Sequence, residues 1–174
     1  GAEHSLTFGF DIAGTPADFP FPSLVWYIDR PADKGAYLSF FPIQNRVRAN
    51  LFTYRQMADP CVKAFKNDPA NGLHALLPDL EPLFGRVTVE GAVAARPIDL
   101  METVNYQQPG VVLIGDAFST TCPTTGTGID KALNDVDVLV NRHVSNWLST
   151  PGMGTEKIAQ FYADPAKVER DAGA

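Results

Sequence analysis

A short acidic turn followed by a glycine-containing loop is the stretch of this sequence best suited to binding chemistry. It starts after the apolar run Val111–Ile114, passes through Gly115-Asp116-Ala117 and reaches the pair Gly126-x-Gly128. Glycines let a backbone approach a ligand closely, and unpaired N–H groups at a helix start attract electron-rich ligand atoms. A carboxylate at the end of a buried strand can accept hydrogen bonds from sugar hydroxyls, so Asp116 is the leading candidate residue. This order of strand, turn, loop and helix predicts a nucleotide or dinucleotide site.

The same stretch resembles the second FAD-binding motif of the single-component flavoprotein monooxygenases of the aromatic-hydroxylase type. That motif runs Gly-Asp-Ala, then Pro, then a Gly-x-Gly pair and a helix that carries an Asp. Two positions depart from it, because Ser119 stands where His is common and Asp130 stands where Asn is common. The positions that match are Gly115, Asp116, Ala117, Pro123, Gly126, Gly128 and Asp135.

The resemblance implies that FAD is the cofactor and that Asp116 binds its ribityl chain. The Gly126–Gly128 turn would present backbone N–H groups to the pyrimidine edge of the flavin, where a helix N-terminus stabilises the anionic reduced ring. The simpler alternatives are an Asp that caps its own loop and a plain helix cap. For the threonines of the loop, ligand contacts and loop hydrogen bonds are both open. The expected cofactor-binding residues are Gly115, Asp116, Pro123, Thr125, Gly126, Thr127, Gly128 and Ile129.

Composition argues against several other classes of function. A formal net charge of −6 disfavours nucleic acid as a partner. The three histidines, His4, His74 and His143, lack the spacing of a metal site, and no residue is expected to act as a catalytic group. The two cysteines lie far apart, which favours a reducing cytoplasm over a disulfide framework. No apolar run reaches the roughly 18 residues of a membrane span.

The elements ahead of the motif are expected to form a sheet domain over residues 1–100. Alternating apolar and polar residues predict an antiparallel or mixed sheet, most simply a meander. Residues 59–67 and 70–77 have short helical patterns, and residues 86–100 predict one long bent strand or two strands with a kink at Gly91. The four earlier strands are expected at Ser5–Ile12, Leu24–Asp29, Tyr37–Phe41 and Arg46–Tyr54.

Residues 101–174 are expected to hold the motif itself. A buried strand is predicted at Val111–Ile114, and the apolar positions of residues 128–148 recur with the 3.6-residue period of one helix about 30 Å long. Two short surface helices follow, over residues 154–163 and 165–172. The predicted fold class is α+β: a substrate-domain-like antiparallel or mixed sheet, then the last strand and long helix of a Rossmann-like FAD-binding domain.

The resemblance implies the C-terminal half of a monooxygenase that hydroxylates an aromatic ring with O2 and NAD(P)H. The N-terminal βαβ unit with its G-x-G-x-x-G motif is absent from this sequence. The chain is therefore expected to be inactive alone and to need a missing N-terminal FAD-binding segment or a second copy. The partner of the sheet would be an aromatic small molecule, although its aromatic residues are more simply explained as sheet core; they are Trp26, Tyr27, Phe40, Phe41 and Phe52.

Two other functions remain open at this point. The chain could be a non-catalytic binding module that keeps the fold without FAD, which the absent pyrophosphate motif favours. It could also belong to a halogenase-like or dehydrogenase-like flavoprotein branch, which the residues present do not distinguish.

Overall fold

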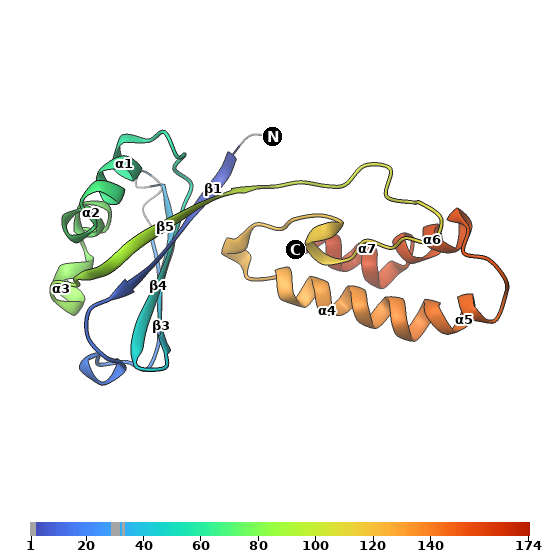
Figure 1. Cartoon of the computed structure of the whole chain (residues 1–174), viewed down its shortest axis with the longest axis horizontal. Helices are drawn as coiled ribbons and strands as arrows, with labels where there is room; N and C mark the ends of the chain where they lie inside the picture. Colours follow the sequence, from blue (N-terminus) through green and yellow to red (C-terminus); the bar gives the residue numbers. More distant parts are fainter. Residues whose placement is uncertain (1–2, 29–31, 33) are drawn as a thin grey trace. The chain divides into compact units, whose positions relative to one another are not determined.

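A computed structural model describes residues 3–28, 32 and 34–174 of the chain. The chain divides into two compact units, residues 2–99 and 100–174 (Figure 1). Each unit has its own hydrophobic core. The expected end of the second strand, at Asp29, lies outside the described residues. The predicted α+β class is confirmed, with an antiparallel sheet first and helices after it.

The first unit is built on a five-stranded antiparallel sheet in the order β2-β3-β4-β1-β5. Only β2, β3 and β4 form a meander. The predicted meander of all four strands is wrong for β1, which lies between β4 and β5, because the long connection over residues 13–23 carries the chain to the far edge of the sheet. That connection includes the 3₁₀ turn η1, Pro16–Asp18. The strands are β1 Glu3–Ile12, β2 Leu24–Tyr27, β3 Gly35–Ile43, β4 Arg46–Thr53 and β5 Val89–Asp99.

Three helices cover one face of this sheet (Figure 1). Phe65 is fully buried, and its ring lies edge-on to Phe8 and Phe10, with centroids 5.2 and 5.5 Å away. Asp59 caps the first helix by accepting a hydrogen bond from the Cys61 N–H, as the Asp-Pro pair predicts. The third helix was not predicted. The helices are α1 Pro60–Asn67, α2 Pro69–Leu76 and α3 Leu80–Phe84.

Strand β5 is one long bent strand, which is the first of the two arrangements predicted for residues 86–100. Its pairing with β1 shifts register between Gly9 and Asp11, opposite Gly91, which has a φ of +71°. A left-handed φ suits glycine, and the extra residues at this point form a bulge that bends the strand.

The second unit contains a long helical run that matches the predicted one. It consists of α4 Gly128–Val138, a π-helical segment η5 at Leu139–Val144, and α5 Ser145–Leu148. The π-helical segment was not predicted. Helices α6 Thr155–Tyr162 and α7 Pro165–Ala172 follow. They are not merely surface helices, because Ile158 and Phe161 of α6 are fully buried in the core of this unit, and Lys167 of α7 is fully buried as well.

The predicted strand at Val111–Ile114 is wrong. Val111 makes a single isolated bridge with Gln108, and residues 112–114 pair with no strand among the described residues. The backbone at Ile114 is extended, with φ −127° and ψ 157°, so the local conformation is strand-like. A ladder also needs a neighbouring strand. Instead, the Tyr162 hydroxyl binds both backbone groups of Leu113, at 2.8 Å from its N–H and 3.2 Å from its carbonyl oxygen.

Within the part of the chain that the structure describes, no helix has both the length and the apolar character of a membrane span.

Candidate functional site

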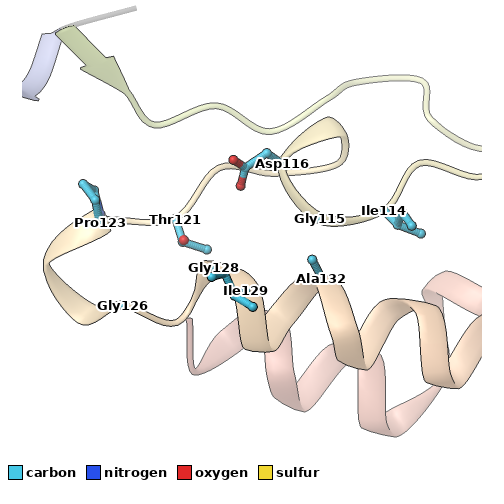
Figure 2. Close-up of a pocket in the computed structure, with 9 residues that line it drawn as sticks. All are labelled: Ile114, Gly115, Asp116, Thr121, Pro123, Gly126, Gly128, Ile129 and Ala132. Atoms are coloured by element: carbon cyan, nitrogen blue, oxygen red, sulfur yellow. The ribbon is translucent and has the colours of Figure 1, made fainter. Parts of the chain in front are cut away.

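A cavity of about 540 Å³ lies between the acidic turn and the start of α4 (Figure 2). Six of the eight predicted cofactor-binding residues line it, together with Ile114, Thr121 and Ala132. The six are Gly115, Asp116, Pro123, Gly126, Gly128 and Ile129. The structure therefore brings most of the motif together around one space.

The acidic turn is the 3₁₀ turn η3, Gly115–Ala117. Gly115 is buried with a φ of +55°, and a Cβ built there would lie 3.2 Å from the Cβ of Ala132 on α4. Glycine is required here for both conformation and space. The Asp116 side chain is exposed and lies on the cavity side of the turn, facing Thr121 and the start of α4 (Figure 2). A carboxylate held in this way can accept hydrogen bonds from the hydroxyls of a ligand.

The start of α4 forms the opposite wall of the cavity. Its N-cap residue, Thr127, makes no side-chain capping hydrogen bond. The first backbone N–H groups of a helix have no acceptor within the helix, so those of Gly128 and Ile129 remain available to a ligand. Gly126 has a φ of +68°, which favours glycine, and a Cβ on Gly128 would come within 3.2 Å of the Thr121 hydroxyl. The wall thus combines uncapped donors with a backbone that a ligand can approach.

Two predicted contact residues, Thr125 and Thr127, do not line the cavity. Their hydroxyls lie 2.8 Å apart, and the Thr125 hydroxyl donates to the Cys122 carbonyl at 2.8 Å. Their hydroxyls therefore stabilise the 3₁₀ turn η4, Pro123–Thr125, and the loop after it. Asp130, where the resembled motif commonly has Asn, is largely exposed and forms an ion pair of 3.6 Å with Arg170. It does not line the cavity either.

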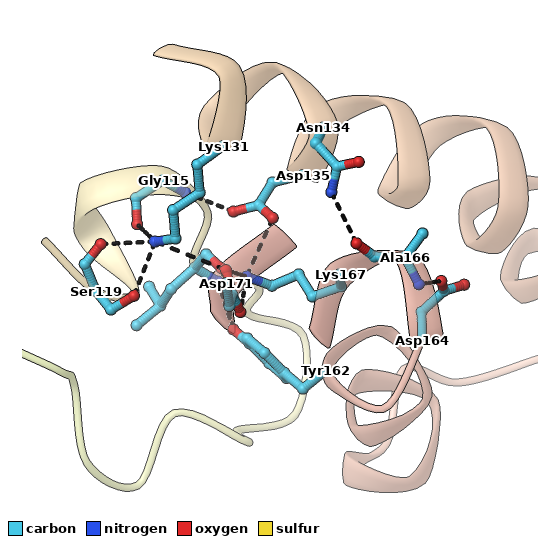
Figure 3. A network of polar contacts seen from close by, with 11 residues as sticks. Gly115, Ser119, Lys131, Asn134, Asp135, Tyr162, Asp164, Ala166, Lys167 and Asp171 are labelled. Atoms are coloured by element: carbon cyan, nitrogen blue, oxygen red, sulfur yellow. Dashed lines mark hydrogen bonds and ion pairs between the residues drawn. The ribbon is translucent and has the colours of Figure 1, made fainter. Parts of the chain in front are cut away.

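Beneath the turn lies a network of buried charges that sequence reasoning missed (Figure 3). Lys131, Asp135 and Lys167 are at most 1% exposed. Asp135 accepts the Gly115 N–H at 2.8 Å, and its other oxygen lies 3.0 Å from the Lys167 ammonium. Lys167 also binds both carboxylate oxygens of Asp171, at 3.1 and 2.9 Å. Of these residues, only Asp135 carried a signal in the sequence, through its position in the motif.

Lys131 attaches the network to the turn. Its ammonium donates to the Gly115 carbonyl at 3.2 Å, to the Ser119 carbonyl at 2.6 Å and to the Ser119 hydroxyl at 2.8 Å. Burial lowers the pKa of Lys131, and the carboxylate of Asp171 opposes that change. The helical period alone could have shown that Lys131 and Asp135 share a face of α4, but not that this face is the buried one.

The features around the cavity fit part of an FAD molecule. Asp116 is placed for ribityl hydroxyls, and the uncapped start of α4 is placed for an electron-rich ring edge that gains negative charge on reduction. No part of this cavity carries the G-x-G-x-x-G sequence that binds a pyrophosphate. Among the described residues, no group of three or more His, Cys, Asp or Glu side chains could hold a metal ion.

The aromatic residues of the sheet divide between its two faces. Trp26 and Phe40 pack into the core beneath the helices, as the simpler explanation holds. Strand alternation places Tyr27, Phe41 and Phe52 on the opposite face. There the Phe52 ring lies 4.5 Å from the ring of Tyr37, between centroids, and Tyr27 is 65% exposed.

Comparison with known proteins places these features in a family. The family model of squalene epoxidase matches residues 54–169 of the chain. The 3-demethoxyubiquinol 3-hydroxylase of Escherichia coli (strain K12) is 38% identical over 50 residues, which cover 29% of this chain and 13% of the hydroxylase.

Solved structures of flavoproteins have a similar fold. The flavin-dependent brominase Bmp2 aligns over 97% of this chain and 41% of its own, with a TM-score of 0.67 and 15% identity. PqsL, a probable FAD-dependent monooxygenase from Pseudomonas aeruginosa, aligns over 97% of this chain and 45% of its own, with a TM-score of 0.61 and 19% identity. The chain thus spans less than half the length of each of these proteins.

Proposed function

The chain belongs to the squalene epoxidase family, and from this premise we propose that it forms the ribityl and pyrimidine side of the FAD site of a flavin-dependent monooxygenase. One observation carries the proposal. The exposed carboxylate of Asp116 and the uncapped start of α4 line the same cavity. A ribityl chain offers hydroxyls to the first, and a flavin ring offers carbonyl oxygens to the second.

Each group of the chain has a distinct task in this proposal. Asp116 accepts hydrogen bonds from the ribityl hydroxyls and so fixes the cofactor along the turn. The N–H groups of Gly128 and Ile129 stabilise negative charge at the pyrimidine edge, because they are oriented before that charge develops. Pro123 forms a rigid, apolar part of the cavity wall. The bound FAD supplies oxygen activation with electrons from NAD(P)H.

The substrate that we propose is an aromatic small molecule, covered by the helix-free face of the sheet. The neighbouring rings of Tyr37 and Phe52 form an aromatic patch on that face, and the ion pair of Asp11 and Arg48 lies on the same face of the sheet. Aromatic rings pack well against such a surface. The hydroxylase relative is named for a quinol, which is a ring compound.

The outer face of the helical run that begins with α4 is a candidate binding surface for a missing N-terminal FAD-binding segment or for a second copy of the chain. Ile129, Leu133 and Val136 of α4 and Val140 of the following segment η5 form one stripe, with exposures of 76, 63, 44 and 50%. The opposite face buries Lys131 and Asp135 together with Val138, and the exposed side also carries Asp130 and Asp137. Contiguous exposed apolar surface of this kind usually meets a partner. We propose that an N-terminal FAD-binding segment of βαβ type covers the stripe, because the stripe starts at Ile129, which also lines the cavity.

Sedimentation of the purified chain tests the choice of partner. A monomer that becomes a dimer only at high concentration agrees with the proposal. A stable dimer that the substitution Leu133→Glu dissociates would show instead that a second copy covers the stripe.

A non-catalytic binding module is the second candidate. The residues that line the cavity do not carry a G-x-G-x-x-G motif, so the cavity by itself offers no pyrophosphate site of that kind. The two candidates differ in one measurable property, which is whether this chain binds FAD at the cavity.

Titration of FAD into the purified chain, followed by flavin fluorescence, tests the proposed function. We expect saturable binding that the Asp116→Ala substitution weakens about tenfold or more, as loss of a charged hydrogen-bond partner does. Asp137→Ala is the matched control, because Asp137 is an exposed carboxylate on α4 that does not line the cavity and accepts a hydrogen bond from Asn141 at 2.7 Å. No binding at high micromolar FAD would refute the proposal. Hydroxylation of an aromatic compound by this chain with FAD and NADPH alone would refute the expectation that it is inactive without a partner.

A further inference from the structure

We propose that Lys131 and Lys167 are positioning residues for the Gly115–Ala117 turn, and that they make the cofactor site depend on the C-terminal helix α7 (Figure 3). This inference rests on the proposed function, since the turn presents Asp116 to the cavity. Neither lysine belongs to the motif that the sequence resembles.

Lys131 holds both ends of the turn from below. Its three hydrogen bonds end on the carbonyl of Gly115, at the start of the turn, and on the carbonyl and hydroxyl of Ser119, two residues after its end. An ammonium group has three donors, so all of its donors are used on this one segment. Asp116 lies between the two points of attachment, and its position therefore follows that of Lys131. Ser119 stands where the motif commonly has His, and here its hydroxyl completes the lysine site.

Lys167 extends the same support to α7. Its ammonium lies 3.0 Å from Asp135, which binds the Gly115 N–H, and 2.9 Å from Asp171, one turn further along α7. The ammonium also lies 4.2 Å from the centre of the Phe118 ring, directly after the turn. The path from α7 to the turn is thus continuous: Lys167, Asp135, then the Gly115 N–H. Every contact in it is buried from solvent.

The charge balance supports a positioning role. Lys131 and Lys167 carry two positive charges, and Asp135 and Asp171 carry two negative ones, so the network is neutral as a whole. Buried ions are costly, and apolar residues of the same size often stabilise a fold equally well. What a buried ionic network supplies instead is a fixed geometry, because each of its members must keep its partners. The geometry fixed here is that of the turn.

Hydrogen exchange of the backbone amides, without FAD, tests this inference independently of cofactor binding. We expect the Gly115 amide to exchange about tenfold faster or more in Lys131→Met and in Lys167→Met, because the turn then opens locally. Lys157→Met is the matched control, since Lys157 also donates to three carbonyls, those of Trp147, Thr150 and Gly152. Its loss is expected to leave the Gly115 amide unchanged. Ser119→Ala, which removes a single contact, provides a milder variant that keeps the fold.

FAD affinity gives the second readout. We expect Lys131→Met and Lys167→Met to weaken FAD binding by about tenfold to a hundredfold, the range that outer-shell partners reach at metal sites. The double variant Lys167→Met/Asp135→Asn should recover much of the loss, because the amide oxygen of Asn still accepts the Gly115 N–H while the fully buried carboxylate is gone. Asp171, which also loses Lys167, is 22% exposed and keeps the Lys131 ammonium at 3.9 Å.

The outcomes separate this inference from the proposed function. Unchanged exchange at Gly115 in both folded lysine variants would overturn the inference, whatever the chain does with FAD. Faster exchange at Gly115, in a chain that binds no FAD, would support the positioning role and refute the proposed function. Equal acceleration at all amides, with no recovery in the double variant, would show a role in global stability only and would overturn the inference.

Discussion

Removal of the Lys167 ammonium tests the energetics of the buried network. In Lys167→Met the side chain keeps nearly its volume, but Asp135, which is fully buried, loses its ion pair of 3.0 Å. Removing one partner of a buried pair typically costs about 3–5 kcal/mol, because the other charge remains without compensation. Since whole domains are stable by only about 5–15 kcal/mol, we expect a large part of the stability of residues 100–174 to be lost.

Urea unfolding followed by tryptophan fluorescence measures this loss. Trp147 is 4% exposed in the core of residues 100–174, and the other tryptophan, Trp26, belongs to the first unit. A Trp26→Phe background therefore leaves a reporter for the second unit alone. Lys157→Met, which leaves three partly solvated carbonyls, should cost about 1 kcal/mol. The double variant Lys167→Met/Asp135→Asn should be more stable than Lys167→Met.

The argument fails if Lys167→Met costs no more than Lys157→Met. It also fails if the double variant shows no recovery, because the cost would then not come from an uncompensated carboxylate.

Three further predictions concern packing, pH and the loop. Gly72→Ala should destabilise the sheet unit by about 1–3 kcal/mol, since its Cβ would lie 2.5 Å from the Cα of Phe65; urea unfolding followed through Trp26 checks this. Burial raises the pKa of Asp164, but hydrogen bonds from the backbone of α7 and from His143 outweigh it and lower the pKa below its ordinary value. Its stabilisation is therefore present above the ordinary aspartate pKa and is lost as pH falls through the lowered one, so acid unfolding should depend less steeply on pH in Asp164→Asn. Gly126→Ala should cost about 1–2 kcal/mol, because its φ is +68°, and should weaken FAD binding in the fluorescence titration.

Local patterns predicted most elements of this fold because each signal lay within a few residues. Alternation located the strands, Asp59 and Pro60 located the start of α1, and the 3.6-residue period located the run that begins at Gly128. The order of the strands was wrong for β1, since a hairpin pattern does not say which edge a long connection reaches. The strand at Val111–Ile114 was wrong because apolar, β-branched residues favour an extended backbone but do not supply the neighbour that completes a ladder.

The residues of the candidate site also fall into those that the sequence could predict and those that it could not. Its glycines and Asp116 could be predicted, because a tight turn and a close backbone approach demand particular residue types at fixed spacing. Lys131 and Lys167 could not, since a lysine in a helix is usually solvated and only the tertiary structure shows which face is buried. The hydroxyls of Thr125 and Thr127 could not be assigned for a related reason: a loop threonine finds a partner nearby in either case.

Mapping of the FAD contacts on the backbone amides tests the central claim most directly. With the chain labelled with 15N, FAD should shift the amide signals of Gly115, Gly126, Gly128 and Ile129, which surround the cavity. Asp116→Ala should reduce these shifts at the same FAD concentration, whereas Asp137→Ala should not. Shifts confined to the sheet of residues 2–99, or the absence of any shift at saturating FAD, would contradict the claim that this cavity forms one side of a flavin site.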